Sequence, residues 1–460
     1  MPSKFSKLPV SVVDIRAGSV VAPLETWRHT FGLGGINTLP IPSKVREGIA
    51  RCRPRLVRIF IQEFFQIYPE HGRFDWSRLD PYMDSLERLG GKVVAALCIK
   101  PKPLYPSIDQ KIWRPNDVKE WQTVVAELVR RYSVQRKLVT HWEIGNEVDI
   151  GEHGGCPYLI TDPADYTEYY RMTIQPILEV FPEAKVGGPA NANIRNEPQA
   201  GFVRLCRQQG LPLHFLSHHC YSDDPNLHAT FIREARAMVA GMSPRPEIMV
   251  TECGPGIGDK VSVEDQAFEP YRAGATAGMI LETMNAGLDW SFYYHLWDQT
   301  CYSEDFAVFF PPPHVRKIML WHWNERPHRI GLFGVSQEVR PQYFVYWMLG
   351  QLGAERLAAT SDHQDVRVLA GRAPGRVSAM LVNYSTQAPT DRIVTLRYTQ
   401  LTPGVKRLTS WRIDEQRRWT EETLELHPYE SREVCTEGEF EAQVYIPAQC
   451  VAMVSLEDRA

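Results

Sequence analysis

Residues 139–151, VTHWEIGNEVDIG, begin as a short apolar strand and end at a Gly-Asn-Glu corner. A carboxylate at the end of a buried strand contributes little to folding, because it needs water or a partner. Similar β-branched runs recur along the chain, and successive runs start 30 to 47 residues apart. A (β/α)8 barrel of about 250 residues uses about 31 residues for each strand–helix unit. The spacing therefore predicts a barrel in which this stretch is the fourth strand.

The other predicted strands lie on both sides of this stretch. We expect them in TWRHTFG (26–32), LVRIF (56–60), KVVAALC (92–98), KVGGPA (185–190), FLSHHCY (215–221), EIMVTE (247–252) and LDWSFYYHL (288–296). Helical patterns separate these runs. Between residues 118 and 132 apolar side chains recur every three or four positions, and Asn116 is the predicted N-cap. Asp162 is expected to cap the helix that begins at Pro163.

After about residue 353 the pattern changes to apolar–polar alternation in short runs separated by turn residues. This alternation is typical of an all-β module, and we predict a β-sandwich over residues 354–460. The barrel is expected over residues 20–353. Within residues 1–19, SVVDI (11–15) is a candidate extra strand of the sandwich. The predicted fold class is α/β, a (β/α)8 TIM barrel with a C-terminal all-β sandwich domain.

Composition excludes several classes of protein. Of the 460 residues, 43% are hydrophobic and 23% charged, and the net charge of −4 argues against nucleic acid as a partner. We find no apolar run long enough for a membrane span, and no apolar core of a secretory signal at the start. Nine scattered cysteines without a CxxC pair suit free thiols in a reducing compartment. We therefore predict a cytoplasmic protein with no cofactor and no metal.

Glu147, at the Gly-Asn-Glu corner, needs a partner acid at another strand end. The stretch IMVTECGPG offers Glu252, which follows an apolar run and precedes a Gly-Pro-Gly turn. The two glutamates are 105 positions apart, which corresponds to three strand–helix units of about 35 residues. Glu252 is therefore expected to end the seventh strand and to face Glu147 across the mouth of the barrel. Two carboxylates meeting there suggest cleavage of a glycosidic bond.

The chain resembles clan A glycoside hydrolases, and most closely family 39, which includes β-xylosidases and α-L-iduronidases. The resemblance is carried by Asn146-Glu147, by Glu252, and by the segments TWRHTFG, FDWSRLDPYMDSLERLG, GLFGVSQEVRPQYFVYWMLGQLG and IPAQCVAMVSLE. It implies a retaining hydrolase of a small glycoside or oligosaccharide that works by two-step double displacement. Glu252 would be the nucleophile and Glu147 the acid/base. Gly145 and Val148 depart from the family pattern, and these departures are expected to reshape the sugar subsite.

Further substrate-binding residues are predicted around the two acids. The resemblance implies that Asn146 binds the sugar 2-hydroxyl. His219 and Tyr221 share one strand face by the period of two; we expect Tyr221 to hold Glu252 ionised and His219 to line the sugar subsite. Arg58, near the end of its strand, is a candidate to neutralise the acid pair, although buried barrel arginines also serve as structural ion-pair partners.

The aromatic platform for the sugar has two candidates, Tyr294 and Trp297, because the last strand reads FYYHLWD. Glu143 and His141 share the strand face of Glu147 but lie deeper, so we interpret them as packing or supporting groups. The loop containing Asp149, Glu152 and His153 lacks a regular ligand spacing and is interpreted as solvated instead of metal-binding.

Two other functions are compatible with the same residues. One is a transglycosylase, in which a sugar instead of water resolves the covalent intermediate. The other is a catalytically inactive carbohydrate-binding barrel, in which Glu252 is dispensable. In each case the partner is a carbohydrate. Xylose, arabinose, galactose, glucose and uronate differ by single groups that loops recognise. The sandwich also offers a surface on which the protein could form a homo-oligomer.

Overall fold

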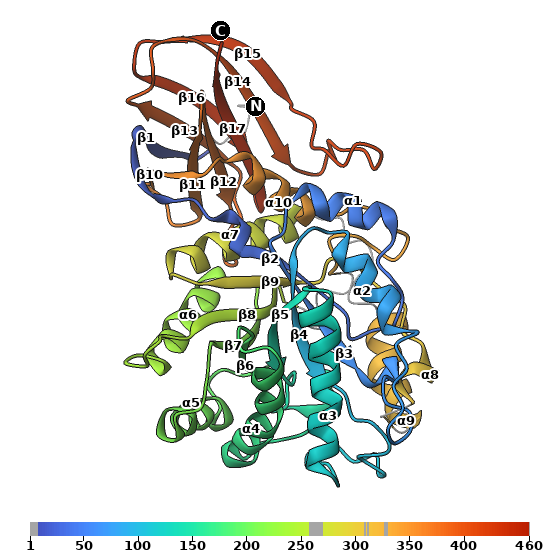
Figure 1. The fold of residues 1–460 in the computed structure, drawn as a ribbon. Helices are drawn as coiled ribbons and strands as arrows, with labels where there is room; N and C mark the ends of the chain where they lie inside the picture. The colour runs from blue at the N-terminus through green and yellow to red at the C-terminus, as the bar shows by residue number, and fades with distance from the viewer. Residues whose placement is uncertain (1–7, 257–269, 308–309, 311, 326–329, 460) are drawn as a thin grey trace.

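The protein consists of a barrel surrounded by helices and a second, all-β part that packs against helices on one side of the barrel (Figure 1). The computed structural model describes residues 8–256, 270–307, 310, 312–325 and 330–459. None of the helices in these ranges is both long and apolar enough to cross a bilayer.

The barrel contains eight parallel strands that close in chain order, with β2 hydrogen-bonded to both β3 and β9. Its strands are β2 (His29–Leu33), β3 (Leu56–Gln62), β4 (Lys92–Cys98), β5 (Val139–Ile144), β6 (Lys185–Asn191), β7 (Phe215–Tyr221), β8 (Glu247–Gly254) and β9 (Trp290–Tyr294). Almost every residue of these strands is buried, as expected where helices cover the outside of a parallel sheet. The predicted fold class is confirmed.

Helices on the outside of the barrel connect successive strands (Figure 1). The longer ones are α1 (Ser43–Arg51), α2 (Leu79–Glu87), α3 (Val118–Val129), α4 (Pro163–Val180), α5 (Glu197–Gln209), α6 (Pro225–Met238), α7 (Pro270–Asn285) and α10 (Pro341–Gln351). The other helical segments are η1 (Thr26–Arg28), η2 (Glu63–Phe65), η3 (Arg130–Gln135), η4 (Gly151–Gly154), α8 (Ser303–Phe306), α9 (Pro312–Val315) and η6 (Arg316–Glu325). The last three lie in the long connection between β9 and α10.

Helix caps follow the predicted chemistry with one correction. Asp162 caps α4 as expected, because its carboxylate accepts the N–H of Ala164 (2.7 Å). The N-cap of α3 is Asp117 and not Asn116: the Asp117 carboxylate accepts the N–H of Glu120 (3.0 Å). The side-chain amide of Asn116 instead donates to the carbonyl of Pro103 (3.2 Å). Both residues are good caps, and only the position of the first helical turn distinguishes them.

The all-β part is one hydrogen-bonded sheet in the order β15-β14-β17-β12-β11-β10-β1-β13-β16. Its strands are β1 (Val10–Pro23), β10 (Glu355–Ser361), β11 (Val366–Ala373), β12 (Arg376–Asn383), β13 (Arg392–Thr399), β14 (Gly404–Ile413), β15 (Glu430–Thr436), β16 (Phe440–Ile446) and β17 (Cys450–Asp458). Inward side chains from all nine strands form a core of their own, as in a sandwich. β1 pairs with β10 and β13, so the N-terminal strand belongs to this part.

The two parts share an apolar boundary. Helix α7 packs on β11, β12 and β17, and Met380, Val451 and Met453 of the sheet belong to the same buried cluster as the barrel core. The boundary reaches the carboxyl end of β7, where the hydroxyl of Tyr384 donates to the carbonyl of Asp223 (2.8 Å).

Candidate active site

Glu147 lies just beyond β5, at a corner that glycine residues shape. Gly145 and Glu147 both have positive φ, 91° and 45°, and the N–H of Glu147 donates to the carbonyl of Ala190 (2.9 Å). A left-handed backbone is uncommon for a residue with a side chain and is found preferentially at functional sites. A Cβ at Gly154 would overlap Oε2 of Glu147. Only glycine therefore leaves room for the Glu147 carboxylate in this position.

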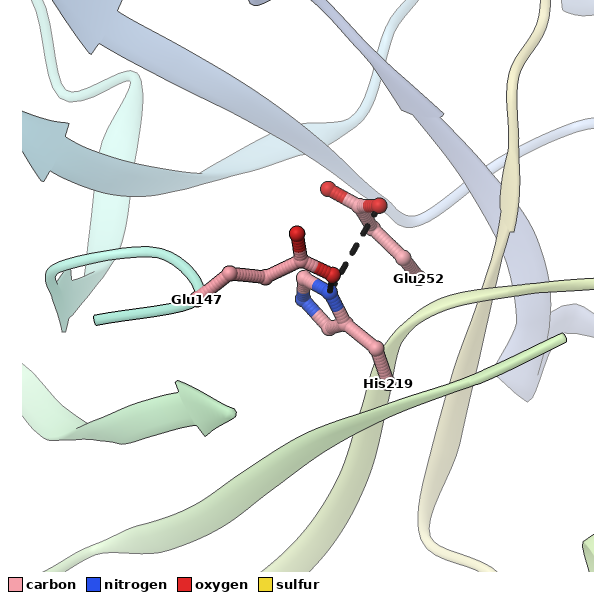
Figure 2. Close-up of side chains that lie close together, drawn as sticks. All are labelled: Glu147, His219 and Glu252. Atoms are coloured by element: carbon pink, nitrogen blue, oxygen red, sulfur yellow. Dashed lines mark hydrogen bonds and ion pairs between the residues drawn. The ribbon is translucent and has the colours of Figure 1, made fainter. Parts of the chain in front are cut away.

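Glu147 and Glu252 approach each other from different strands, with the His219 ring beside them (Figure 2). Nδ1 of His219 lies 2.8 Å from Oε1 of Glu147 and 3.5 Å from Oε2 of Glu252. One oxygen of each glutamate and a nitrogen of His219 all lie within 4.8 Å of one another. His219 on β7 is in register with Glu252 on β8. The structure thus brings together the two acids that are 105 residues apart in the sequence.

Arg58, in β3, connects the acids to the strand beneath Glu147. Its Nε donates to Glu143 (2.6 Å), Nη1 to Oε1 of Glu252 (2.9 Å) and Nη2 to Oδ1 of Asn146 (2.7 Å). The Arg58 and Glu143 side chains are fully buried. Glu143, which we expected to be a packing or supporting group, is the second anion paired with Arg58. Arg58 occupies the amide oxygen of Asn146, and the amide nitrogen of Asn146 donates to the carbonyl of Gly154 (3.5 Å).

Tyr221, in β7, donates its hydroxyl hydrogen to Oε2 of Glu252 (2.7 Å). Arg58 and Tyr221 together donate to both oxygens of this carboxylate. Hydrogen bonds from donors stabilise the charged form of a buried carboxylate. The predicted contact between Tyr221 and Glu252 is present.

The surroundings of Glu147 favour the opposite state. Burial, reinforced by the charge of Asp149, raises the pKa of Glu147 to about 8, although Arg58 acts against this. Burial also lowers the pKa of His219 below its usual value, so its ring is neutral at pH 7. At neutral pH Glu147 therefore carries a proton, while Glu252 is held by two donors. A glutamate with a raised pKa can serve as a general acid beside a second glutamate that accepts hydrogen bonds from two donors.

A cavity of about 300 Å³ opens onto the two acids. Of the predicted site residues, Asn146, Glu147, Tyr221, Glu252 and Tyr294 line it. Other described residues that form its wall are Gly35, Ile36, Phe60, Gln62, His153, Gly154, Gly155, Met319, Trp323 and Ile330. Flat aromatic faces beside a few polar groups suit the apolar and hydroxylated sides of a sugar ring.

For three of the predicted substrate-binding residues, the structure shows whether or not they line the cavity. Trp297 is not among the described residues that line the cavity; it is buried in the core, and its backbone pairs with Phe333. Tyr294 lines the cavity, with its hydroxyl donating to the carbonyl of Gly34 (2.7 Å). His219 contacts the two acids and is not among the described lining residues. β9 ends at Tyr294, so the alternation of side chains between the two faces of a strand does not predict where Trp297 points.

Met319 and Trp323 were missed by the sequence reasoning. Both lie in η6, beyond the last barrel strand, and reach back to the cavity. The Trp323 ring is 6.2 Å from that of Tyr294 and 5.4 Å from that of His295. The one available signal was the aromatic run WHW at 321–323. Such a run is as typical of a buried core as of a binding site.

The chain belongs to the glycosyl hydrolases family 39, because the family model with that description matches residues 55–386. A β-xylosidase from Geobacillus stearothermophilus is 22% identical over 341 residues, which are 67% of this chain and 62% of that protein. A β-xylosidase from Caldicellulosiruptor saccharolyticus is 26% identical over 161 residues, 33% of this chain and 32% of that protein. The chain thus matches less than two thirds of the length of these curated relatives.

Solved structures show the same fold. A monomeric β-xylosidase from Caulobacter crescentus CB15 superposes with a TM-score of 0.75 at 19% identity, covering 98% of this chain and 100% of that one. The GH39 enzyme from Xanthomonas axonopodis pv. citri has a TM-score of 0.75 at 18% identity, with 100% of both chains covered. A glucosidase from Croceicoccus marinus has a TM-score of 0.73 at 18% identity, covering 98% and 99%.

Proposed function

We propose that the protein is a retaining glycoside hydrolase in which Glu252 is the nucleophile and Glu147 the acid/base. The observation that carries this proposal is the short separation of the two carboxylates, with one oxygen of each within 4.8 Å of the other. Retaining enzymes hold their carboxyl groups about 5–5.5 Å apart, whereas inverting enzymes need about 6.5–9.5 Å to admit a water molecule. The separation supports direct attack by Glu252 on the sugar.

In the first step, an oxygen of Glu252 forms a bond to the anomeric carbon as the glycosidic C–O bond breaks. Glu147 gives its proton to the departing oxygen, which leaves as an alcohol. The raised pKa of Glu147, about 8, keeps this proton available at neutral pH. Asn146 is placed to hydrogen-bond the sugar 2-hydroxyl, a contact that strengthens as the oxocarbenium-like transition state forms.

In the second step, water attacks the anomeric carbon and the ester bond to Glu252 breaks. Glu147, now a carboxylate, takes a proton from that water and so returns to its starting state. Esterification removes the charge of Glu252, while Arg58 stays within hydrogen-bonding distance of Asn146 and Glu143. His219, Tyr221 and Arg58 position the acids, and Tyr294 supplies an aromatic face to the sugar.

For the substrate, we propose a small glycoside or oligosaccharide, and β-D-xylosides are the first to be tested because both curated relatives are β-xylosidases. The cavity of about 300 Å³ has room for one sugar ring and part of its leaving group. We also propose a cytoplasmic location, which is supported by nine free thiols, seven of them buried.

The experiment uses Glu147→Ala with nitrophenyl glycosides, whose leaving groups need no acid. We expect slow turnover that added azide accelerates, because azide can enter the space left by the carboxylate and attack the glycosyl-enzyme. The product should be a glycosyl azide of the same configuration as the substrate, as judged by NMR. An azide product of inverted configuration would contradict the two-step mechanism. Sugar products that grow at high acceptor concentration would instead favour a transglycosylase.

A further inference from the structure

We propose that Glu147, His219 and Glu252 also form a binding site for a divalent transition-metal ion of the Zn²⁺ type, and that such an ion inhibits the protein by occupying the acid pair. Among the described residues, this is the one group of three His, Cys, Asp or Glu side chains whose ligand atoms converge within 4.8 Å. The binding part of the proposal rests on geometry alone. The inhibition part rests on the proposed function.

The distances between the three ligand atoms fit a small ion. A four-coordinate Zn²⁺ with bonds of about 2.0–2.2 Å places its ligand atoms about 3.4 Å apart. His219 Nδ1 is 2.8 Å from Oε1 of Glu147 and 3.5 Å from Oε2 of Glu252. The two glutamate oxygens, at most 4.8 Å apart, need to approach by no more than about 1.4 Å.

The charges around the site favour a dication. Three carboxyl groups, Glu143, Glu147 and Glu252, surround one guanidinium, Arg58, so the group has a net charge of −2 once metal binding has displaced the proton of Glu147. Buried charges are costly unless they are paired. Arg58 donates to Oε1 of Glu252, whereas Oε2 accepts the Tyr221 hydroxyl and faces Nδ1 of His219 at 3.5 Å, so Oε2 is the oxygen able to coordinate. A divalent ion would neutralise the charge that Arg58 does not.

The donor set selects the kind of ion. One imidazole nitrogen and two carboxylate oxygens suit Zn²⁺ and Co²⁺, whereas Ca²⁺ and Mg²⁺ require about six or more oxygen ligands. The cavity of about 300 Å³ supplies the entry path and a fourth position for water. Nε2 of His219 is buried and has no hydrogen-bond partner among the described residues. Ligating histidines are usually supported at this second nitrogen, so we expect micromolar affinity instead of the tighter binding of a structural zinc site.

A bound ion blocks both chemical roles at once. Glu147 coordinated to the metal has no proton to give, and Glu252 coordinated to it has no free oxygen for attack. Because the ion occupies the floor of the sugar cavity, it competes with substrate. Zn²⁺ should therefore raise KM and leave kcat unchanged, and a chelator should reverse the effect.

The test is a titration of the whole protein with Co²⁺, followed by the visible absorption of the four-coordinate ion. We expect a saturable band in the native protein that Zn²⁺ abolishes and that Mg²⁺ and Ca²⁺ leave unchanged. His219→Gln and Glu147→Gln, verified as folded by circular dichroism, should both lose the band. Two variants serve as matched controls and should keep it. His153→Gln changes an exposed imidazole that lines the same cavity, and His314→Gln removes another imidazole–carboxylate pair, with Glu152 at 2.8 Å.

The absence of a band in the native protein, or a band that survives in His219→Gln, would overturn the proposal. These outcomes are distinguishable from failure of the proposed function. Binding of Co²⁺ through His219 without cleavage of any glycoside would support the metal site and contradict the proposed hydrolase function. Cleavage of glycosides without binding of Co²⁺ or Zn²⁺ would support the hydrolase function and contradict the metal site.

Discussion

The end of β5 and the end of β8 each carry one glutamate, but the two carboxyl groups have different surroundings. Glu147, beyond β5, is partly buried beside a neutral imidazole, and its pKa rises to about 8. Glu252, within β8, receives hydrogen bonds from Arg58 and Tyr221. The two glutamates thus have different surroundings: one has a raised pKa, and the other accepts hydrogen bonds from two donors. Under the proposed function, this difference makes Glu147 the proton donor and Glu252 the nucleophile.

The largest expected effect comes from replacing Glu252. Glu252→Gln keeps the shape of the side chain but removes the attacking oxygen, so turnover should fall by roughly 10⁴-fold or more. Release of nitrophenolate from a substrate of the native protein measures the loss. Circular dichroism and sugar binding should stay close to native. Activity within tenfold of native would assign the nucleophile elsewhere.

Removing the guanidinium of Arg58 should destabilise the surroundings of Glu252 at the end of β8. Arg58→Met leaves Glu143 and Glu252 as buried, unpaired charges, and we expect a loss of about 3–5 kcal/mol in the free energy of unfolding. Urea denaturation measures this loss. Arg88→Met, at an exposed position after α2, is the control and should change stability by less than about 0.5 kcal/mol. An equal effect of both substitutions would show that the pairing of Arg58 is unimportant.

Removing one donor should bring the surroundings of Glu252 closer to those of Glu147. Tyr221→Phe loses one hydrogen bond to a charged group, worth about 1.5–3 kcal/mol, so kcat/KM should fall by about 10–150-fold. Tyr82→Phe is the control, because it removes a buried hydroxyl that has no partner among the described residues. If Tyr221→Phe kept native kcat/KM, its hydroxyl would have no part in holding the nucleophile.

The pH dependence of kcat/KM should report the raised pKa of Glu147 at the end of β5. As pH rises through about 8, Glu147 loses its proton and kcat/KM should fall by about tenfold per pH unit. Because the folded-state pKa lies above the usual value of 4.5, Glu147 favours the folded state at low pH, and this contribution is lost as pH rises from 4.5 to about 8.

Glu147→Gln tests the same assignment without activity. Its stability relative to the native protein should increase between pH 5 and pH 8, by up to about 1.4 kcal/mol per pH unit. Thermal unfolding at several pH values measures the difference. A difference that stays constant with pH would mean that the pKa of Glu147 is not raised.

Much of the barrel could be predicted from the sequence, because its strands are buried on both faces and read as apolar, β-branched runs. The predicted ranges 92–98 and 215–221 are the observed β4 and β7. The ends of elements were less certain: Asn116 and Asp117 have the same capping chemistry, and β9 is shorter than its apolar run.

Some residues of the candidate site could likewise be predicted from the sequence, and others could not. Glu147, Glu252 and Tyr221 could be identified because each lies at a strand end or on a known strand face. Trp297, one of the two candidates for the aromatic platform, is not among the described residues that line the cavity, and Trp323 was missed. Both lie in the long connection after β9, where no periodicity relates sequence position to direction.

By itself, the sequence determined the class of fold and the two acids, since strand burial and strand spacing are local patterns that neighbouring residues set. The tertiary structure alone decided that Arg58 joins Glu143, Asn146 and Glu252 and that the surroundings of Glu147 raise its pKa. These properties depend on distances of a few ångströms between residues far apart in the chain. Closure of the barrel creates those distances, and electrostatic interactions change steeply over them.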